Sequence, residues 1–200
     1  MFVKTVLIET HKGTDMFNPG KTFFTADEHY LNRGIIEYCN RPFQTPKHMT
    51  QELIRRHNEV VPQDGTVWHI GDVTLEGPHR ADYIRRNIIQ QLNGEHHLVL
   101  GNHDEWKVSS YLKDAFLTVH TAFWFVYERM VFYLGHDPSM YTILENTPNA
   151  YQLCGHIHTL FQDLLPKKRI INVGVDVWDY EPLSLARVIN LIRISKEIGK

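Results

Sequence analysis

The chain has 200 residues, of which 42% are hydrophobic and 12% aromatic, enough apolar material for one globular domain with a sizeable core. Its formal net charge of −2 gives no overall positive field that would draw it to nucleic acid or to an anionic membrane. The two cysteines, Cys39 and Cys154, do not indicate a disulfide framework. Polar residues interrupt the N-terminal apolar residues too soon for a signal peptide or a membrane span. We therefore expect a single cytoplasmic domain over residues 1–200.

The first half of the chain alternates short apolar runs with helical patterns. Each run has four to six residues, many of them β-branched or aromatic, which is the length of a buried strand. Helical spacing covers 50–61, with Thr50 as N-cap and Pro62 beyond the end, and 78–92, which Gly94 stops. The order of strands and helices predicts right-handed βαβ units. The five expected strands that precede polar clusters are 21–26, 66–70, 97–100, 130–134 and 151–154.

The second half of the chain indicates more strands and one closing helix. Residues 116–126 and 128–134 are expected to pair as antiparallel strands, 168–177 to form another strand, and 183–198 a helix. An additional edge or hairpin strand is expected at 2–9. The aromatic stretch 123–127 is predicted to fill a sheet core, because no basic residue interleaves it in the way that nucleic-acid binding would need. We expect one α/β domain with mixed sheets and helices outside them.

Polar clusters follow five of the expected strands. In open α/β folds, residues beyond the carboxyl ends of strands line the functional crevice. A single Asp-x-His or Gly-Asp is a weak signal, whereas all five clusters in order, each after a strand-like run, form a strong one. One rim would then collect three Asp, one Asn and five His: Asp27, His29, Asp72, Asn102, His103, Asp104, His136, His156 and His158.

These ligand types also indicate the kind of ion. Carboxylate, amide oxygen and imidazole without thiolate suit Mn²⁺, Fe, Co²⁺, Ni²⁺ or Zn²⁺ and disfavour a calcium cage of oxygens. The rim carries more ligands than one tetrahedral site needs, so two ions are expected. A carboxylate can bridge two ions, because its two oxygens can point to different ones.

The clusters Asp27-x-His29, Gly71-Asp72, Gly101-Asn102-His103-Asp104, His136 and Gly155-His156-x-His158 together resemble the fingerprint of calcineurin-like metallophosphoesterases. The resemblance extends from about residue 21 to 176. It is strongest to the small uncapped bacterial and phage members, which share an opening like 35–43 and an ending like 172–176. It implies a four-layer αββα sandwich with two divalent transition-metal ions, Mn²⁺ first, with Fe, Ni, Co or Zn as alternatives. By motif position, Asp27, His29 and His158 would hold one ion and Asn102, His136 and His156 the other, with Asp72 bridging both.

The resemblance implies hydrolysis of small phosphate esters, diesters or monoesters, through attack by a metal-bridged hydroxide. His103 is the expected general acid, because it follows the ligand Asn102 yet is not itself needed as a ligand. Asn32 and Arg41 are candidate phosphate contacts. Asp104 is expected to have a structural role, and His69 to be a histidine packed in a sheet.

Two departures from the family pattern narrow the substrate. Leu75 stands where phosphoprotein phosphatases have an Asp, which argues against a protein substrate. Asn32 stands where close relatives often have a His. A nuclease acting on DNA or RNA is the alternative, weakened by the net charge and the lack of a basic extension. A non-catalytic scaffold is a further alternative, but such relatives lose ligand histidines and this chain keeps every one.

Overall fold

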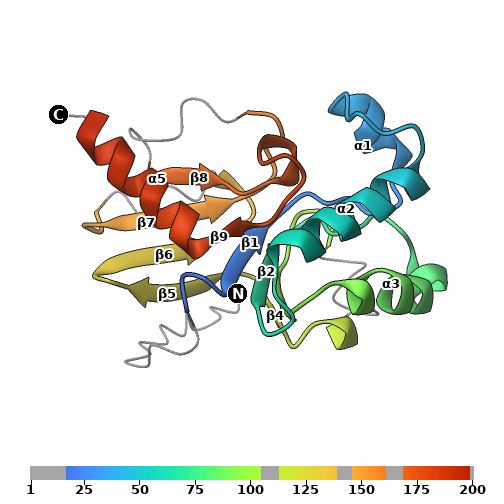
Figure 1. Cartoon of the computed structure of the whole chain (residues 1–200), viewed down its shortest axis with the longest axis horizontal. Coiled ribbons are helices and arrows are strands. Elements are labelled where there is room, and N and C mark those ends of the chain that lie inside the picture. Colours follow the sequence, from blue (N-terminus) through green and yellow to red (C-terminus); the bar gives the residue numbers. More distant parts are fainter. Residues whose placement is uncertain (1–16, 105–112, 139–145, 161–168, 199–200) are drawn as a thin grey trace, which may run out of the picture.

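The computed structural model describes residues 17–104, 113–138, 146–160 and 169–198, which are built around two mixed β-sheets (Figure 1). In the first sheet, four parallel strands are followed by an antiparallel fifth, in the order β4-β3-β2-β1-β9. In the second, β5 pairs antiparallel with β6, and β6, β7 and β8 are parallel. The predicted α/β sandwich is thereby confirmed. The strands are β1 Thr22–Thr25, β2 Thr66–Ile70, β3 Glu95–Val99, β4 Thr118–His120, β5 Phe123–Tyr127, β6 Met130–Leu134, β7 Ala150–Cys154, β8 Ile170–Asn172 and β9 Leu183–Ser184.

Helices cover the outer face of the first sheet. Met49 and Leu53 of α2 join Ile84 and Ile88 of the α3 region in one buried cluster with Leu98 of β3. None of the helices in the described part of the chain is long and apolar enough to cross a membrane. The helical elements are α1 Arg33–Tyr38, α2 Pro46–Val60, α3 Ala81–Asn87 and α5 Leu185–Ile198, with 3-10 turns η1 Pro78–Arg80, η2 Ile89–Gln91, η3 Lys113–Ala115 and η5 Val175–Val177.

The main core lies between the two sheets. Phe24 and Trp68 of the first sheet belong to the same buried cluster as Phe125 and Phe132 of the second. The Phe125 and Phe132 rings stack with centroids 4.8 Å apart. Helix α5 contributes Val188, Ile189 and Ile192 to this cluster. The aromatic stretch 123–127 therefore fills a core, as its sequence predicts, since Phe123 and Phe125 are both buried.

The helix boundaries differ from those that periodicity predicts. Helix α2 begins at Pro46, before the expected start at residue 50, because Thr45 caps it: Thr45 Oγ1 accepts a hydrogen bond from the His48 N–H at 3.1 Å. Helix α1 was not expected; Asn32 caps it by accepting from the Ile35 N–H at 3.2 Å. The single helix expected over 78–92 is divided into η1, α3 and η2. The backbone leaves helical geometry at Ile88, with φ −124° and ψ −75°.

The expected strand 116–126 is wrong as one element. Its first part forms β4, parallel to β3 in the first sheet, and its last part forms β5, antiparallel to β6 in the second. The expected strand 168–177 ends at Asn172, whose side-chain oxygen accepts from the Gly174 N–H at 2.8 Å and turns the chain into η5. The expected closing helix begins at Leu185, after the short strand β9. The expected strand 2–9 lies outside the described residues.

The two sheets meet where β1 and β8 end. Ala26 and Gly174 form a parallel bridge, and the Val175 N–H donates to the Ala26 carbonyl at 3.0 Å. The loop after β1 also runs beside the loop after β2, with a parallel bridge between Tyr30 and Thr74. The polar clusters that follow strands of both sheets are thus directed to one place.

Candidate metal centre

A first group of three acceptor side chains lies at this junction. Asp27 and His29 follow β1, and His158 follows β7, yet one ligand atom from each lies within 4.8 Å of the other two. Asp27 and His29 are buried, whereas His158 is partly exposed. The His29 and His158 ring centroids are 5.4 Å apart. Residues more than a hundred positions apart in sequence therefore form one compact set of metal-ligand types.

A second group adjoins the first and shares Asp27 with it. Ligand atoms of Asp27, Asp72 and His136 lie within 4.8 Å of one another, and Asp72 Oδ2 is 3.2 Å from His136 Nε2. Asn102 Oδ1 lies 3.1 Å from His136 Nε2 and 2.9 Å from His156 Nδ1. Asp72 Oδ2 is also 3.8 Å from His29 Nε2, so this carboxylate of the second group also lies close to a member of the first. The seven residues expected to bind metal are all brought together.

His29 gives a direct test of whether these residues fit a cation. It is buried, and neither its Nδ1 nor its Nε2 has a hydrogen-bond partner. A buried polar atom left without a partner costs about 1–3 kcal/mol. Burial also lowers the pKa of His29 to about 3, so its imidazole is neutral, the form that binds a metal. The residues present therefore fit a divalent cation.

The backbone at the site is held in an uncommon conformation. Side chains other than glycine rarely adopt positive φ, and each instance costs on the order of 1–3 kcal/mol. Such strain persists where surrounding contacts fix it, and it concentrates at functional sites. Five of the seven expected metal ligands have positive φ: Asp27 58°, His29 49°, Asp72 59°, His156 72° and His158 46°.

Glycines allow the ligand loops to approach one another closely. A Cβ on Gly155 would lie 2.7 Å from the Ala26 Cβ and 2.8 Å from Asp27 Oδ2. Gly71 has φ +85°, and a Cβ there would collide with the His136 ring. The glycine in each of these two motifs is thus needed for the loops to pack, independently of any chemistry.

Hydrogen bonds fix the acidic ligands in place. Asp104 is buried, and its Oδ2 accepts from the Asp72 N–H at 2.7 Å and from the Gly101 N–H at 2.9 Å. The His103 N–H donates to Asp72 Oδ1 at 3.0 Å. The Asp27 carboxylate accepts from the His156 N–H at 2.9 Å. Asp104 therefore joins two motif loops, the structural role that its sequence position predicts.

The charges at the site are strongly coupled. Burial raises the pKa of Asp27 to about 6. Burial alone would also raise the pKa of Asp72, but the hydrogen bond and charge of His136 lower it. The same ion pair outweighs burial and raises the pKa of His136 to about 9. The centre thus holds anionic oxygens out of bulk water, where a divalent cation would offset their repulsion.

Arg41 does not reach the centre as a substrate contact, and that expectation is wrong. The side chain is fully buried, and its Nε and Nη2 bind Asp176 at 2.7 and 2.8 Å. Its Nη2 also donates to the Asp27 carbonyl at 2.7 Å, and its Nη1 to the Glu28 carbonyl at 3.0 Å. With its donors engaged in the protein, the guanidinium positions the loop after β1 instead of binding phosphate.

Asp176 is a site residue that the motif analysis did not single out. Its Oδ2 lies 3.2 Å from His158 Nδ1, and this hydrogen bond, against the effect of burial, raises the pKa of His158 to about 10. Cys39 groups with these two residues within 4.8 Å. Because Arg41 already binds both Asp176 oxygens, this group is a supporting network for His158. Its position just after β8, at a further strand end, was the available signal.

Glu28 is a second residue at the site that the sequence motifs did not assign a role. It lies between the two expected ligands of the first motif in the sequence. Its side chain is buried, and its Oε1 lies 2.6 Å from His69 Nδ1. His69 is fully buried in β2, and its Nε2 lies 3.1 Å from His96 Nδ1. His69 is therefore a histidine packed in the sheet, as expected, and it also supports the loop that carries Asp27 and His29.

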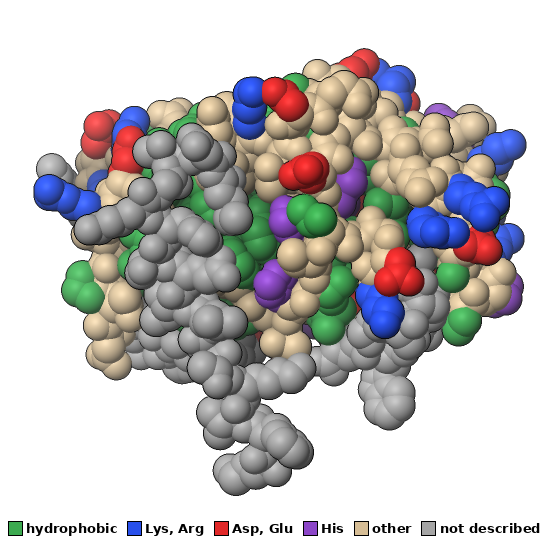
Figure 2. All heavy atoms as spheres, turned by 90° about the horizontal axis from the view of Figure 1, so that it is seen from below, with side chains coloured by type: hydrophobic (Ala, Val, Ile, Leu, Met, Phe, Trp, Pro, Cys, Tyr) green, Lys and Arg blue, Asp and Glu red, His purple; other side chains and the backbone are tan. Residues whose placement is uncertain are grey.

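The centre opens on a pocket of about 470 Å³. His103 lies exposed in its wall, with its ring centroid 5.9 Å from that of His29. Asn32, the α1 cap, also lines it, so this candidate phosphate contact stays at the pocket while Arg41 does not. On the face of the molecule that Figure 2 shows, histidine side chains gather near the middle. The lining is His29, Asn32, Gly34, Ile35, Tyr38, Asp72, Leu75, Asn102, His103, His156 and His158.

No family model matches the chain. It is 32% identical over 183 residues to the uncharacterized protein MJ1445 of Methanocaldococcus jannaschii, across 89% of this chain and 94% of that protein. The two proteins belong to one family.

Comparison with solved structures concerns the fold alone. The Aquifex aeolicus protein of unknown function AQ665 superposes with a TM-score of 0.71 at 24% identity, over 86% of this chain and 98% of that one. The match shows a shared fold. The Pseudomonas putida nuclease MPE gives a TM-score of 0.41 at 17% identity, over 70% of this chain and 62% of that one, and this level supports no conclusion on activity.

Proposed function

We propose that this protein is a metal-dependent phosphoesterase that hydrolyses small phosphate esters, diesters or monoesters. The observation that carries the proposal is the pair of ligand groups that share Asp27 and open on one pocket. A phosphate ester is anionic and repels hydroxide, so its hydrolysis needs adjacent positive charge and a positioned nucleophile. Two neighbouring cation sites meet this need.

The geometry supports a division of the ligands between two ions. Asp27, His29 and His158 would hold one ion, and Asn102, His136 and His156 the other. Asp72 would bridge them, since its Oδ2 lies 3.2 Å from His136 Nε2 and 3.8 Å from His29 Nε2. These oxygen and imidazole ligands favour Mn²⁺, with Fe, Ni, Co or Zn as alternatives.

The chain's own residues would bind the substrate and move a proton. When bound, two divalent ions supply charge neutralisation for the phosphate and acidify a water at neutral pH. His103, exposed in the pocket wall, would donate a proton from its imidazole to the leaving-group oxygen. Asn32, on the same pocket, would orient the phosphate through its side-chain amide. Asp104 and Arg41 hold the loops that carry these residues.

Pocket shape supports a small substrate. Helix α1 contributes Gly34, Ile35 and Tyr38 to the wall, so the segment after the first motif bounds the cleft on one side. A volume of about 470 Å³ falls in the roughly 300–1,000 Å³ range of small-molecule sites. Leu75, at the position where phosphoprotein phosphatases carry an Asp, lines the same pocket.

The test is a screen of the metal-reconstituted protein over phosphomonoesters, linear diesters, cyclic nucleotides and short oligonucleotides, with Mn²⁺ compared against Zn²⁺ and Ni²⁺. We expect hydrolysis of small esters that a chelator abolishes and added Mn²⁺ restores. Steeply salt-dependent binding of duplex DNA, with cutting of that DNA in preference to small esters, would replace this function by that of a nuclease.

A further inference from the structure

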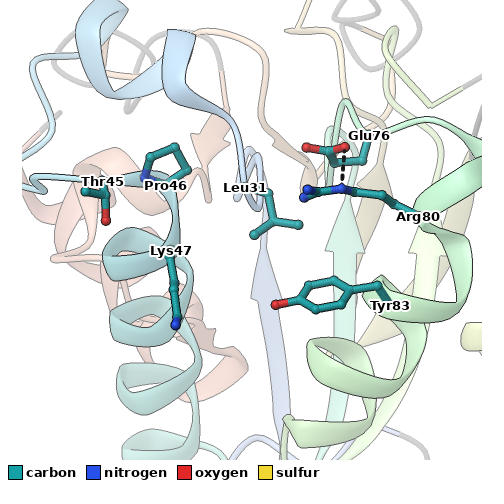
Figure 3. A pocket seen from close by; sticks show the side chains of 7 residues that line it. All are labelled: Leu31, Thr45, Pro46, Lys47, Glu76, Arg80 and Tyr83. Carbon is teal, nitrogen blue, oxygen red and sulfur yellow. Dashed lines mark ion pairs between the residues drawn. The ribbon is translucent and has the colours of Figure 1, made fainter.

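A groove leads away from the candidate metal centre. The pocket of the centre shares Asn32, Gly34 and Leu75 with a hollow of about 440 Å³. That hollow shares Leu31 and Glu76 with a pocket of about 590 Å³, the distal pocket, which lies between α2 and the η1–α3 segment (Figure 3). Each of the three cavities therefore shares lining residues with the next, and together they form the groove.

The backbone explains this continuity. The loop after β1 and the loop after β2 run side by side beyond their ligands: the Tyr30 N–H donates to the Val73 carbonyl at 2.8 Å, and Thr74 Oγ1 donates to the Tyr30 carbonyl at 3.0 Å. Leu31 follows His29 by two positions and is tied to α2, since its N–H donates to Thr50 Oγ1 at 3.0 Å. A ligand along the groove would thus lie on extensions of the two metal-binding loops.

The distal pocket combines positive charge with an aromatic ring. Lys47 lies in the first turn of α2 on one side, and Arg80 and Tyr83 lie on the other (Figure 3). Tyr83 is 47% exposed, and its hydroxyl points across the pocket towards the α2 side. Arg80 lies 5.9 Å from the centroid of the Tyr83 ring and 3.5 Å from Glu76.

Cations outnumber acids along the groove although the whole chain carries a net charge of −2. Arg33, Lys47 and Arg80 line it against Glu76. Within the described residues, no ion pair engages Lys47, whose amino group is left for a ligand. In Figure 2, several Lys and Arg side chains lie at the end of the molecule where Figure 1 places α1 to α3.

We propose that the distal pocket binds a nucleoside phosphate portion of the substrate, with the phosphate at Lys47 and Arg80 and the base against Tyr83. This inference rests on the proposed function, because it places the rest of an ester whose scissile phosphate lies at the metal centre. An ammonium and a guanidinium recognise phosphate oxygens, and an aromatic ring stacks on any nucleobase. The volume of about 590 Å³ suits a ligand of this size.

The first test is calorimetric titration of the full Mn²⁺-loaded chain with adenosine 5′-monophosphate, with inorganic phosphate as the probe of the metal centre. We expect Tyr83→Ala to weaken nucleotide binding about fivefold or more, the effect expected for one base–aromatic stack, without changing the binding of inorganic phosphate. Lys47→Ala should weaken nucleotide binding by a similar factor, because it removes a charged hydrogen-bond donor to the phosphate. Tyr83→Phe keeps the ring and should bind like the parent. Arg85→Ala, on the same helix but paired with Asp82 at 2.8 Å, is the matched control.

A second titration, with a short oligothymidylate, distinguishes a small nucleotide from single-stranded nucleic acid as the ligand of the distal pocket. Tighter binding than the mononucleotide, with the same loss in Lys47→Ala and Tyr83→Ala, assigns the pocket to single-stranded nucleic acid; weaker binding assigns it to a small nucleotide. Nucleotide affinity that is absent, or equal in both alanine variants and the parent, overturns the proposal. Turnover of bis(p-nitrophenyl) phosphate by the parent is scored separately, so a failed phosphoesterase with an intact nucleotide site is recognised as such.

Discussion

Asp176 Oδ2 lies 3.2 Å from His158 Nδ1, and Arg41, which is 135 positions away in the sequence, binds both oxygens of the same Asp176 carboxylate. This hydrogen bond fixes the ring orientation of an expected metal ligand. It also links the loop after β8 to the loop after β1, because Arg41 donates to the Asp27 and Glu28 carbonyls as well. The geometry of the first ligand group therefore depends on residues that bind no metal.

Replacing Asp176 tests this dependence. Asp176→Asn keeps the size of the side chain but removes the charge that orients His158, and we expect metal affinity to fall roughly 10- to 100-fold. Titration of the metal-free protein with Mn²⁺ measures the loss. Asp64→Asn, at an exposed pair with Lys21, is the control and should bind like the parent. Equal affinities in Asp176→Asn and the parent would show that Asp176 does not position a metal ligand.

Asp72 is expected to be the most sensitive ligand. The parent should hold about two ions per chain after reconstitution with Mn²⁺. Asp72→Asn preserves an acceptor for the His103 N–H but removes the negative charge between the two groups. We expect it to hold fewer ions and to lose hydrolytic activity, measured by elemental analysis and by turnover. Glu37→Gln, at an exposed pair with Arg33, is the control. Two ions and full activity in Asp72→Asn contradict the bridging assignment.

His103 can be tested through the leaving group. If its imidazole protonates the departing oxygen, His103→Ala should lose about a hundredfold to ten-thousandfold in kcat on alkyl esters while keeping its metal. Nitrophenyl esters need little protonation, so their loss should be much smaller. Because both kinds of ester use the same site, the quantity that tests the role of His103 is the ratio of their losses in kcat. A loss of equal size for good and poor leaving groups would assign His103 to phosphate binding or metal positioning instead.

The sequence predicts the centre better than its surroundings, for a physical reason. Polar residues at strand ends are local patterns, so the ligands could be found from Asp27 to His158 without knowing how the strands pair. Arg41 and Asp176 are 135 positions apart, and only the tertiary fold shows that they bury each other's charge. Residues 118–120 and 123–127 are separated by only two residues, and their assignment to different sheets depends on non-local pairing. Cap residues such as Thr45 set helix starts that periodicity alone misplaces.

Three buried histidines, His57, His69 and His96, lie side by side and should make stability depend on pH; the ring centroid of His57 is 6.5 Å from that of His69 and 5.7 Å from that of His96. Burial lowers the pKa of His57 to about 3, and its Nε2 lies 2.9 Å from the Asn93 carbonyl. Since the unfolded chain binds this proton near pH 6.5 and the folded chain does not, the stabilisation is complete above pH 6.5 and is lost as the pH falls towards 3. Each such group contributes a slope of about 1.4 kcal/mol per pH unit in this window.

The His57→Gln variant isolates this effect, because glutamine can still donate to Asn93 but does not titrate. Urea unfolding of the metal-free protein between pH 4 and pH 7 should give a free energy that falls less steeply with acid in His57→Gln than in the parent, by about 1.4 kcal/mol per pH unit. His48→Gln, at an exposed position of the same helix, should keep the parent slope. Parallel curves for His57→Gln and the parent would mean that His57 is protonated in the folded state, contrary to its burial.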